Sequence, residues 1–205
     1  MKARFSCVYE AKCADLKSKI LLCSDGEHLT NLEFVESAES VESQDSHAKN
    51  LRDLKIDSSV ESSGDLCVES GIELGDLPIF AESKKWLDLY FSGAIPRFAP
   101  KIALPKNASA FALRVWEILR MIPHGKTTTY GAIARQIARE FGITKMSAQA
   151  VGGAVGRNPI AIIIPCHRVV GTNGNLTGYA GGIANKIALL QIEGIATNRL
   201  KMPKI

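Results

Sequence analysis

A cluster of prolines divides the chain. The prolines between residues 96 and 105 each fix their own φ and lack a backbone N–H, so a helix or a central strand is excluded there. The charge reverses at the same place: residues 1–95 hold 10 Lys and Arg against 18 Asp and Glu, and residues 96–205 hold 15 against 3. We therefore predict an extended linker over residues 96–106, between an N-terminal α/β domain and a second domain over residues 107–205.

The N-terminal part is predicted to contain a strand pair and a helix. Residues 19–23 form an apolar run, residues 29–35 alternate apolar with polar, and Asp25-Gly26 between them is typical of a turn. Aromatic and aliphatic residues over 81–91 predict an amphipathic helix. Residues 36–76 hold 11 acidic and 3 basic residues, so they bury too little apolar surface to offset their ordering entropy. We expect a solvated loop or a partly helical insertion there.

The C-terminal part is predicted to be mainly helical. A first helix is expected from about residue 108 to residue 120, with apolar residues at helical spacing. Thr129 is a suitable N-cap for a helix through Phe141, and Ser147 for a short helix from residue 148 to about 155. Two short helices around a glycine-containing turn indicate a helix-turn-helix, although an ordinary helical hairpin has the same pattern.

The second of these helices is unusually rich in small residues. Its sequence, Ala148-Gln-Ala-Val-Gly-Gly-Ala-Val155, includes two glycines, each of which costs about 1 kcal/mol relative to alanine. Small residues allow a helix to enter a narrow groove, and tight packing on a neighbouring helix would need the same residues. The excess positive charge of this half attracts polyanions, and a solvated basic surface is the alternative explanation.

The cysteines do not form a framework. Their number is odd and no C-x-x-C pair is present, which argues against paired disulfides and against a zinc ribbon. The polar N-terminus is unlike a signal peptide, and no run of about 20 apolar residues predicts a membrane helix. We expect a cytoplasmic protein whose thiols are free, and the question is which of them is reactive: Cys7, Cys13, Cys23, Cys67 or Cys166.

Cys166 has the surroundings that activate a thiol. The apolar run 160–165 is predicted to be a short buried strand, and it ends at Cys166-His167-Arg168. A thiol with an ordinary pKa of about 8.5 needs such neighbours to ionise at neutral pH. Adjacent residues of a strand point to opposite faces, so a water would relay the proton between Cys166 and His167. Glu193 would orient His167, although a lone Glu near a helix end is more often solvated and a buried structural cysteine is the commoner case.

Several motifs of the C-terminal half resemble one family. The sequence Ile164-Pro-Cys-His-Arg-Val169 resembles the active-site motif of the O6-alkylguanine-DNA alkyltransferases. The similarity extends to Ala150–Ala154, Arg157–Pro159 and Gly178–Gly182, and it covers roughly residues 108–193. The resemblance implies an α+β fold, with a small RNase H-like sheet domain followed by a mainly helical domain that contains a helix-turn-helix.

The resemblance also implies roles for individual residues. Cys166 would accept the alkyl group, with His167 acting through water and Glu193 behind it. Asn158 would tie the DNA-binding helix to the active-site turn, and Tyr130 would lie beside the flipped nucleotide. The DNA-binding residues would be Ala148, Gln149, Gly152, Arg157 and Tyr130. The substrate pocket would be lined by Val169, Tyr179 and Ala180, with Lys186 on the side of the cysteine.

The implied activity is a direct repair of DNA. The alkyl group of O6-alkylguanine in double-stranded DNA would move irreversibly to Cys166, in a single turnover and without a cofactor, after the base leaves the stack. Activity on O4-alkylthymine is left open. Gln149 stands where the family often has an arginine, so we predict retained repair with altered DNA affinity. We expect a monomer. We expect no metal, because Cys7, Cys23 and His28 do not match the zinc ligands of some relatives.

Two other functions fit parts of the sequence. A DNA-binding regulator without chemistry would explain the helix-turn-helix and the basic half, but Cys166 counts against it. A cysteine hydrolase would use Cys166 and His167, but neighbouring residues are poorly placed for direct proton abstraction. A hydrolase also gives no reason for the basic half or for the glycine-rich helix.

Overall fold

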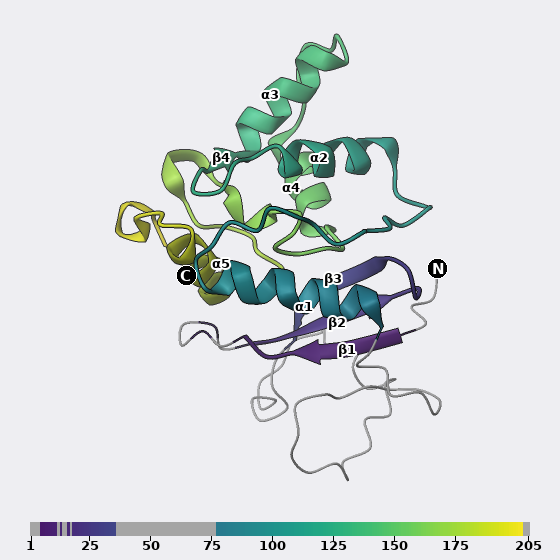
Figure 1. Ribbon diagram of the computed structural model, residues 1–205. Coiled ribbons are helices and arrows are strands. Elements are labelled where there is room, and N and C mark those ends of the chain that lie inside the picture. The colour runs from purple at the N-terminus through teal and green to yellow at the C-terminus, as the bar shows by residue number, and fades with distance from the viewer. Residues whose placement is uncertain (1–4, 12, 14–15, 17, 36–76, 203–205) are drawn as a thin grey trace, which may run out of the picture.

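The N-terminal half contains a three-stranded antiparallel sheet in the order β1-β2-β3, with a helix packed beside it (Figure 1). The computed structural model describes residues 5–11, 13, 16, 18–35 and 77–202, so the predicted insertion over 36–76 lies outside the described residues. The predicted strand pair is confirmed, and one strand was not predicted. The strands are β1, Phe5–Tyr9, β2, Lys19–Ser24, and β3, Leu29–Val35.

The turn between β2 and β3 has the chemistry expected from its sequence. The Asp25 carboxylate accepts hydrogen bonds from the backbone N–H groups of Glu27 at 3.1 Å and His28 at 2.8 Å. Gly26 has φ 103°, in the region that favours glycine. The turn is therefore fixed locally, and it sets the register of the two strands.

Two segments from the C-terminal half cover the free edge of β3. Leu29 pairs with the linker, through its N–H to Lys101 O at 2.8 Å and through its carbonyl to Ala103 N at 3.0 Å. Leu32 pairs in the same way with Pro159 O and Ala161 N, both at 2.8 Å. These backbone bonds join the sheet to the segment that leads toward Cys166.

Five α-helices follow the sheet in the described residues. The caps predicted at Thr129 and Ser147 are confirmed, since both side chains accept bonds from backbone N–H groups of the first turn. Ser109 caps the helix before them in the same way. The helices are α1, Pro78–Phe91, α2, Ala110–Arg120, α3, Tyr130–Glu140, α4, Ala148–Gly156, and α5, Ile183–Ile192.

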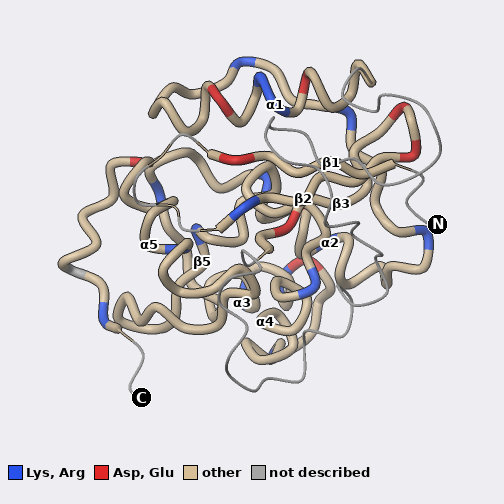
Figure 2. The backbone as a smooth tube through the Cα atoms, turned by 90° about the horizontal axis from the view of Figure 1, so that it is seen from below, with Lys and Arg blue, Asp and Glu red and all other residues tan. Residues whose placement is uncertain are grey.

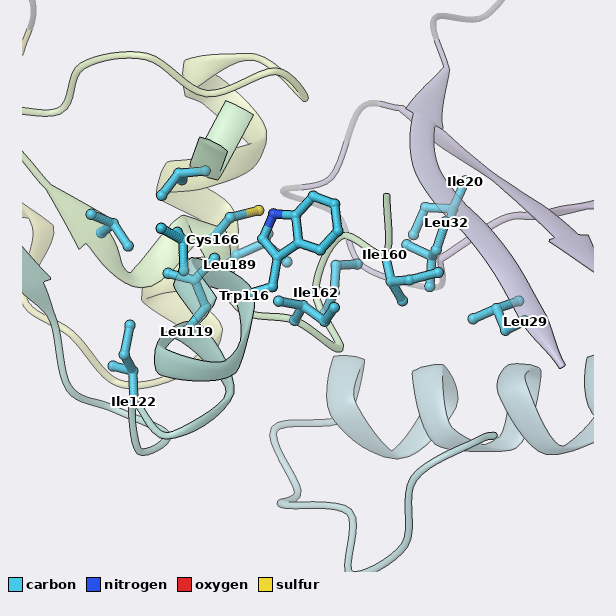
Figure 3. Packing of buried hydrophobic residues seen from close by; sticks show 14 of the residues in the cluster. Ile20, Leu29, Leu32, Trp116, Leu119, Ile122, Ile160, Ile162, Cys166 and Leu189 are labelled. Carbon is cyan, nitrogen blue, oxygen red and sulfur yellow. The ribbon is translucent and has the colours of Figure 1, made fainter. Parts of the chain in front are cut away.

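Helix α4 is held between α2 and α3 by its small residues. Val151, Ala154 and Val155 are buried, and the indole N–H of Trp116 on α2 donates to the Ala154 carbonyl at 2.9 Å. A hydrophobic cluster continues from this contact in two directions, to Cys166 and to the sheet residues Leu29 and Leu32 (Figure 3). The core therefore reaches from the sheet to the thiol without a break.

The predicted strand over residues 160–165 is wrong. Ile160 makes only an isolated bridge with Leu32, and a tight turn follows in which Ile162 has φ 66°. A short buried apolar run has the same pattern in a strand and in a buried turn, so periodicity does not separate them. Cys166–Arg168 then form one turn of 3-10 helix, which removes the strand geometry assumed for Cys166 and His167.

A short parallel pair connects the turn after Cys166 to the start of α3. It joins β4, Thr128–Thr129, to β5, Val169–Val170. Tyr130, the first residue of α3, is thereby placed beside the segment that follows the cysteine. Within the described part of the chain, no helix is both long and apolar enough to cross a membrane.

Candidate active site

A pocket of about 380 Å³ lies beside Cys166. The cysteine itself is buried, with 7% of its surface exposed, and it is one of the residues that line this pocket. Four segments line the pocket: β3, the end of α4 with the turn after it, Cys166, and the loop before α5. The lining residues are Asn31, Leu32, Glu33, Phe34, Val155, Gly156, Arg157, Asn158, Pro159, Ala161, Cys166, Gly178, Tyr179, Ala180 and Gly181.

The surroundings of the thiol act on its ionisation in opposite directions. Burial raises the pKa of Cys166, because a thiolate loses its hydration there. Polar hydrogens of Asn158 and Tyr179 and the positive charge of Lys186 lower the pKa of the same thiol. The net result is a raised pKa, so the cysteine needs a base to lose its proton.

His167 and Glu193 form a fully buried pair. The distance from His167 Nε2 to Glu193 Oε1 is 2.7 Å, and both side chains have 0% exposure. Burial raises the pKa of the Glu193 carboxyl, but bonds from His167 and Arg168 outweigh burial and hold that pKa well below its usual range. Glu193 is therefore ionised, and the expectation that a lone Glu near a helix end is solvated does not apply here.

The hydrogen bonds assign the tautomer of His167. An ionised carboxylate only accepts, so His167 Nε2 carries the hydrogen that points to Glu193. Burial lowers the pKa of His167, although Glu193 opposes this, and the ring is neutral. Nδ1 then keeps a free lone pair, and this atom is buried without a hydrogen-bond partner among the described residues. Nδ1 is therefore the atom that can take a proton.

Three residues without a predicted relay role also donate hydrogen bonds to Glu193. Tyr90, on α1, donates its hydroxyl to Glu193 Oε1 at 2.9 Å and lies 3.3 Å from His167 Nε2. Arg168 donates to Glu193 Oε2 through Nε and to Oε1 through NH2, each at 2.9 Å, and to the Ile122 carbonyl at 2.6 Å. The N–H of Gly125 adds a bond at 3.1 Å. Arg168 is adjacent to His167 in sequence, whereas nothing in the sequence connects Tyr90 to Glu193.

Asn158 joins the end of α4 to the turn before the cysteine. Its side-chain N–H donates to the carbonyls of Ile164 at 2.8 Å and Ile160 at 3.3 Å. Its side-chain oxygen accepts from the Ile160 N–H at 3.1 Å. Asn158 therefore connects the end of α4 to the turn before Cys166 through three hydrogen bonds.

Lys186 is buried on the inner side of the site. Its Nζ donates to the Val169 carbonyl at 2.6 Å and lies 5.8 Å from the centre of the Tyr179 ring. Burial lowers the pKa of Lys186 to about 8, although the nearby Cys166 acts in the opposite direction. Lys186 and Val169, both expected to line the substrate pocket, are not among the residues that line this pocket. Lys186 acts on the thiol through its charge.

Tyr130 packs between α4 and the loop before α5. Its hydroxyl donates to the carbonyls of Gly178 at 3.1 Å and Thr177 at 3.3 Å. A Cβ on Gly152 would lie 3.8 Å from the Tyr130 ring, which is an ordinary van der Waals contact, so an alanine would also fit against this ring. Burial raises the pKa of the Tyr130 hydroxyl, and the hydroxyl stays protonated.

The other predicted DNA-binding residues lie on the surface. Ala148 and Gln149 are exposed in the first turn of α4, away from the pocket. Arg157 is exposed at the end of the same helix and lines the pocket, as do Tyr179 and Ala180. In the described residues, no group of three or more His, Cys, Asp or Glu side chains could hold a metal ion.

Comparison with known proteins gives consistent results. Residues 110–195 match the family model described as 6-O-methylguanine DNA methyltransferase, DNA binding domain. A methylated-DNA–protein-cysteine methyltransferase of Methanosarcina acetivorans is 37% identical over 175 residues, which cover 85% of this chain and 91% of that protein. The protein of the same name from Mycobacterium leprae is 47% identical over 114 residues, which cover 56% of this chain and 65% of the relative, just under two thirds.

The fold shows the same relationship. The crystal structure of Mycobacterium tuberculosis OGT in complex with DNA superposes with a TM-score of 0.59 and 32% identity, over 94% of this chain and 92% of that one. Both the sequence and the mixed α/β fold therefore match over most of the chain, and the matched region contains Cys166, His167 and Glu193. The chain belongs to the methylated-DNA–protein-cysteine methyltransferase family.

Proposed function

We propose that the protein repairs DNA by moving the alkyl group of O6-alkylguanine to Sγ of Cys166, once per molecule. The observation that carries this proposal is the buried Cys166, which lines a pocket and is directly followed by His167. The bond from His167 Nε2 to Glu193 fixes the tautomer of the ring, so that Nδ1 has a free lone pair. The names of the relatives, which refer to methylated DNA and to a protein cysteine, support the same reaction.

The first step is proton removal from the thiol. A water between Cys166 and His167 Nδ1 would carry the proton to the ring, and Glu193 would stabilise the imidazolium through its bond to Nε2. Lys186 favours the resulting thiolate through its charge. Because burial disfavours both charged forms, the thiolate would persist only when the substrate is in place.

The second step is an in-line substitution at the alkyl carbon. The bond from Sγ to carbon forms while the bond from carbon to O6 breaks, and the electron pair of that bond stays on the guanine. The departing base takes up a proton, for which the neutral hydroxyl of Tyr130 is a donor once it leaves the Gly178 carbonyl. The product is a thioether without a good leaving group, so no second turnover follows.

We propose that α3 and α4 form a helix-turn-helix that presents α4 to the minor groove. Three observations support this. The first turn of α4 is exposed, and most residues of this helix are small. Each of the three acidic residues between 96 and 205 is bonded to an arginine of the same half. Lys and Arg are spread over this half rather than gathered in one block (Figure 2). The net positive charge of this half, with 15 Lys and Arg against 3 Asp and Glu, favours contacts with the phosphate backbone of DNA.

The remaining assignments are also proposals. The antiparallel β1-β2-β3 sheet with α1 beside it supports an RNase H-like N-terminal domain, and the linker over 96–106 supports the predicted division. We also propose that the protein acts as a monomer. No step of the proposed reaction needs a cofactor.

The experiment that tests the proposal follows the lesion. Duplex DNA with one O6-methylguanine is incubated with an excess of wild-type protein or of Cys166→Ser, then digested, and its nucleosides are separated. Wild type is expected to convert O6-methylguanine to guanine in proportion to protein, and Cys166→Ser to leave it unchanged. An intact lesion with bound wild-type protein would instead favour a regulator without chemistry.

A further inference from the structure

One wall of the pocket beside Cys166 comes from the N-terminal sheet. Four consecutive residues of β3, from Asn31 to Phe34, line the pocket together with the residues near the cysteine. This strand belongs to the half of the chain that contains neither the thiol nor its base. The shape of the pocket is therefore set by two parts of the chain, and only one of them does the proposed chemistry.

The position of this wall relative to the thiol is fixed by backbone bonds. Leu32 pairs with Pro159 O and Ala161 N at 2.8 Å each, and the turn that follows leads directly to Cys166. Leu32 and Ile160 are both fully buried. Phe34 is two residues beyond Leu32, and side chains two residues apart on a strand share a face. The Phe34 ring is thus directed toward the C-terminal half.

The Phe34 ring lies against the loop before α5. A Cβ built on Gly181 would lie 2.4 Å from Phe34 Cδ2 and 2.9 Å from Tyr179 Cε1, so both rings touch the backbone of this glycine. The centres of the Phe34 and Tyr179 rings are 6.2 Å apart, with planes tilted by 59°. Tyr179 in turn lies next to Cys166: burial raises the pKa of the Tyr179 hydroxyl well above its usual range, and the neighbouring Cys166 raises it further. The two aromatic rings therefore extend from β3 to the thiol.

We propose that Phe34 is a specificity-determining residue, which limits the size of the alkyl group that reaches Cys166. The inference rests on the proposed function and adds a substrate range to it. A small group such as methyl fits beside the ring, whereas a bulky group such as benzyl must compete with the ring for the same space. A difference of one methylene in an apolar pocket changes a rate by roughly 10- to 200-fold, so removal of a phenyl ring should have a large effect.

The test compares two substrates in matched variants. Rate constants for transfer to Cys166 are measured with duplexes that carry O6-methylguanine or O6-benzylguanine, for wild type, Phe34→Ala, Phe34→Trp and Phe5→Ala. Phe5 is a half-buried phenylalanine of the same sheet outside the pocket lining, so its variant controls for a weakened sheet. The ratio of the benzyl to the methyl rate does not depend on the fraction of folded protein.

Phe34→Ala is expected to raise this ratio by roughly tenfold or more, Phe34→Trp to lower it, and Phe5→Ala to leave it unchanged. If Phe34→Ala does not fold, a lowered ratio in Phe34→Trp carries the inference alone. A ratio that stays constant in the Phe34 variants, while wild type transfers methyl, would overturn the inference and leave the proposed function standing. Absence of methyl transfer by wild type would overturn the proposed function first, and the role of Phe34 with it.

Discussion

Replacement of Glu193 by glutamine keeps the shape of the side chain and removes its charge. Oε1 accepts from His167 at 2.7 Å and from Tyr90 and Arg168 at 2.9 Å each. Oε2 accepts from Gly125 at 3.1 Å and from Arg168 at 2.9 Å. An amide has one oxygen, so its NH₂ group must face at least two N–H donors in either orientation.

The size of the effect follows from these conflicts. Each buried donor without an acceptor costs about 1–3 kcal/mol, so Glu193→Gln should lower the free energy of unfolding by about 2–6 kcal/mol. Loss of one member of a buried ion pair costs about 3–5 kcal/mol, which is the same range. The rate of alkyl transfer should fall by roughly 10²- to 10⁴-fold, the usual contribution of a general base, because the charge that stabilises the imidazolium of His167 is lost and one amide orientation also removes the acceptor of Nε2.

Urea unfolding measures the first quantity and rapid-quench transfer from O6-methylguanine DNA measures the second. The matched control is Glu117→Gln, since Glu117 bonds to Arg114 on the exposed surface and should affect neither measurement. A Glu193→Gln protein that transfers methyl within threefold of the wild-type rate would refute the role of the carboxylate in orienting His167.

Three other variants test separate parts of the site. Tyr90→Phe removes one donor to Glu193, so it should slow transfer by roughly three- to tenfold. It should also raise the midpoint of the acid limb of the pH–rate profile, because the carboxylate then stabilises the imidazolium of His167 more strongly. A slower rate with an unchanged profile would mean that Tyr90 is structural only. Gln149→Arg should tighten DNA binding at low salt and increase its salt dependence, without affecting transfer at saturating DNA, as fluorescence anisotropy and single-turnover assays would show. Lys186 has its pKa lowered to about 8, so the folded state binds fewer protons than the unfolded state between pH 8 and the ordinary lysine pKa. This group therefore makes the protein more stable as pH rises through that window, by about 3 kcal/mol, and Lys186→Met should lose that increase in urea titrations across the window.

Local signals in the sequence predicted the elements that depend on local chemistry. The strand pair over 19–24 and 29–35 follows from Asp25-Gly26, and the starts of α3 and α4 follow from the caps at Thr129 and Ser147. In each case the residues that decide the structure lie within a few positions of the element. The role of Asn158 between α4 and the cysteine comes from the family resemblance and stays a prediction, although its side chain makes three hydrogen bonds to the turn before the cysteine.

Features that depend on distant contacts were not predictable in this way. Tyr90 reaches Glu193 across 103 positions of the chain, and its aromatic pattern on α1 indicates only a buried face. Phe34 and Gly181 contact each other only because Leu32 pairs with the turn before Cys166. The same pairing explains why residues 160–165 are not a strand. The single bridge to β3 uses the backbone groups of Pro159 and Ala161, and the chain then turns before it reaches Cys166.

The most direct test of the account is the mass of the protein after it meets its substrate. Wild type and Cys166→Ser are each mixed with duplex DNA that contains one O6-methylguanine, and the intact proteins are weighed by mass spectrometry before and after digestion to peptides. The account predicts a gain of one methyl group per wild-type molecule, located on Cys166 and absent from the variant. An unchanged mass for wild type that has bound the lesion, or a methyl group on another residue, would contradict it.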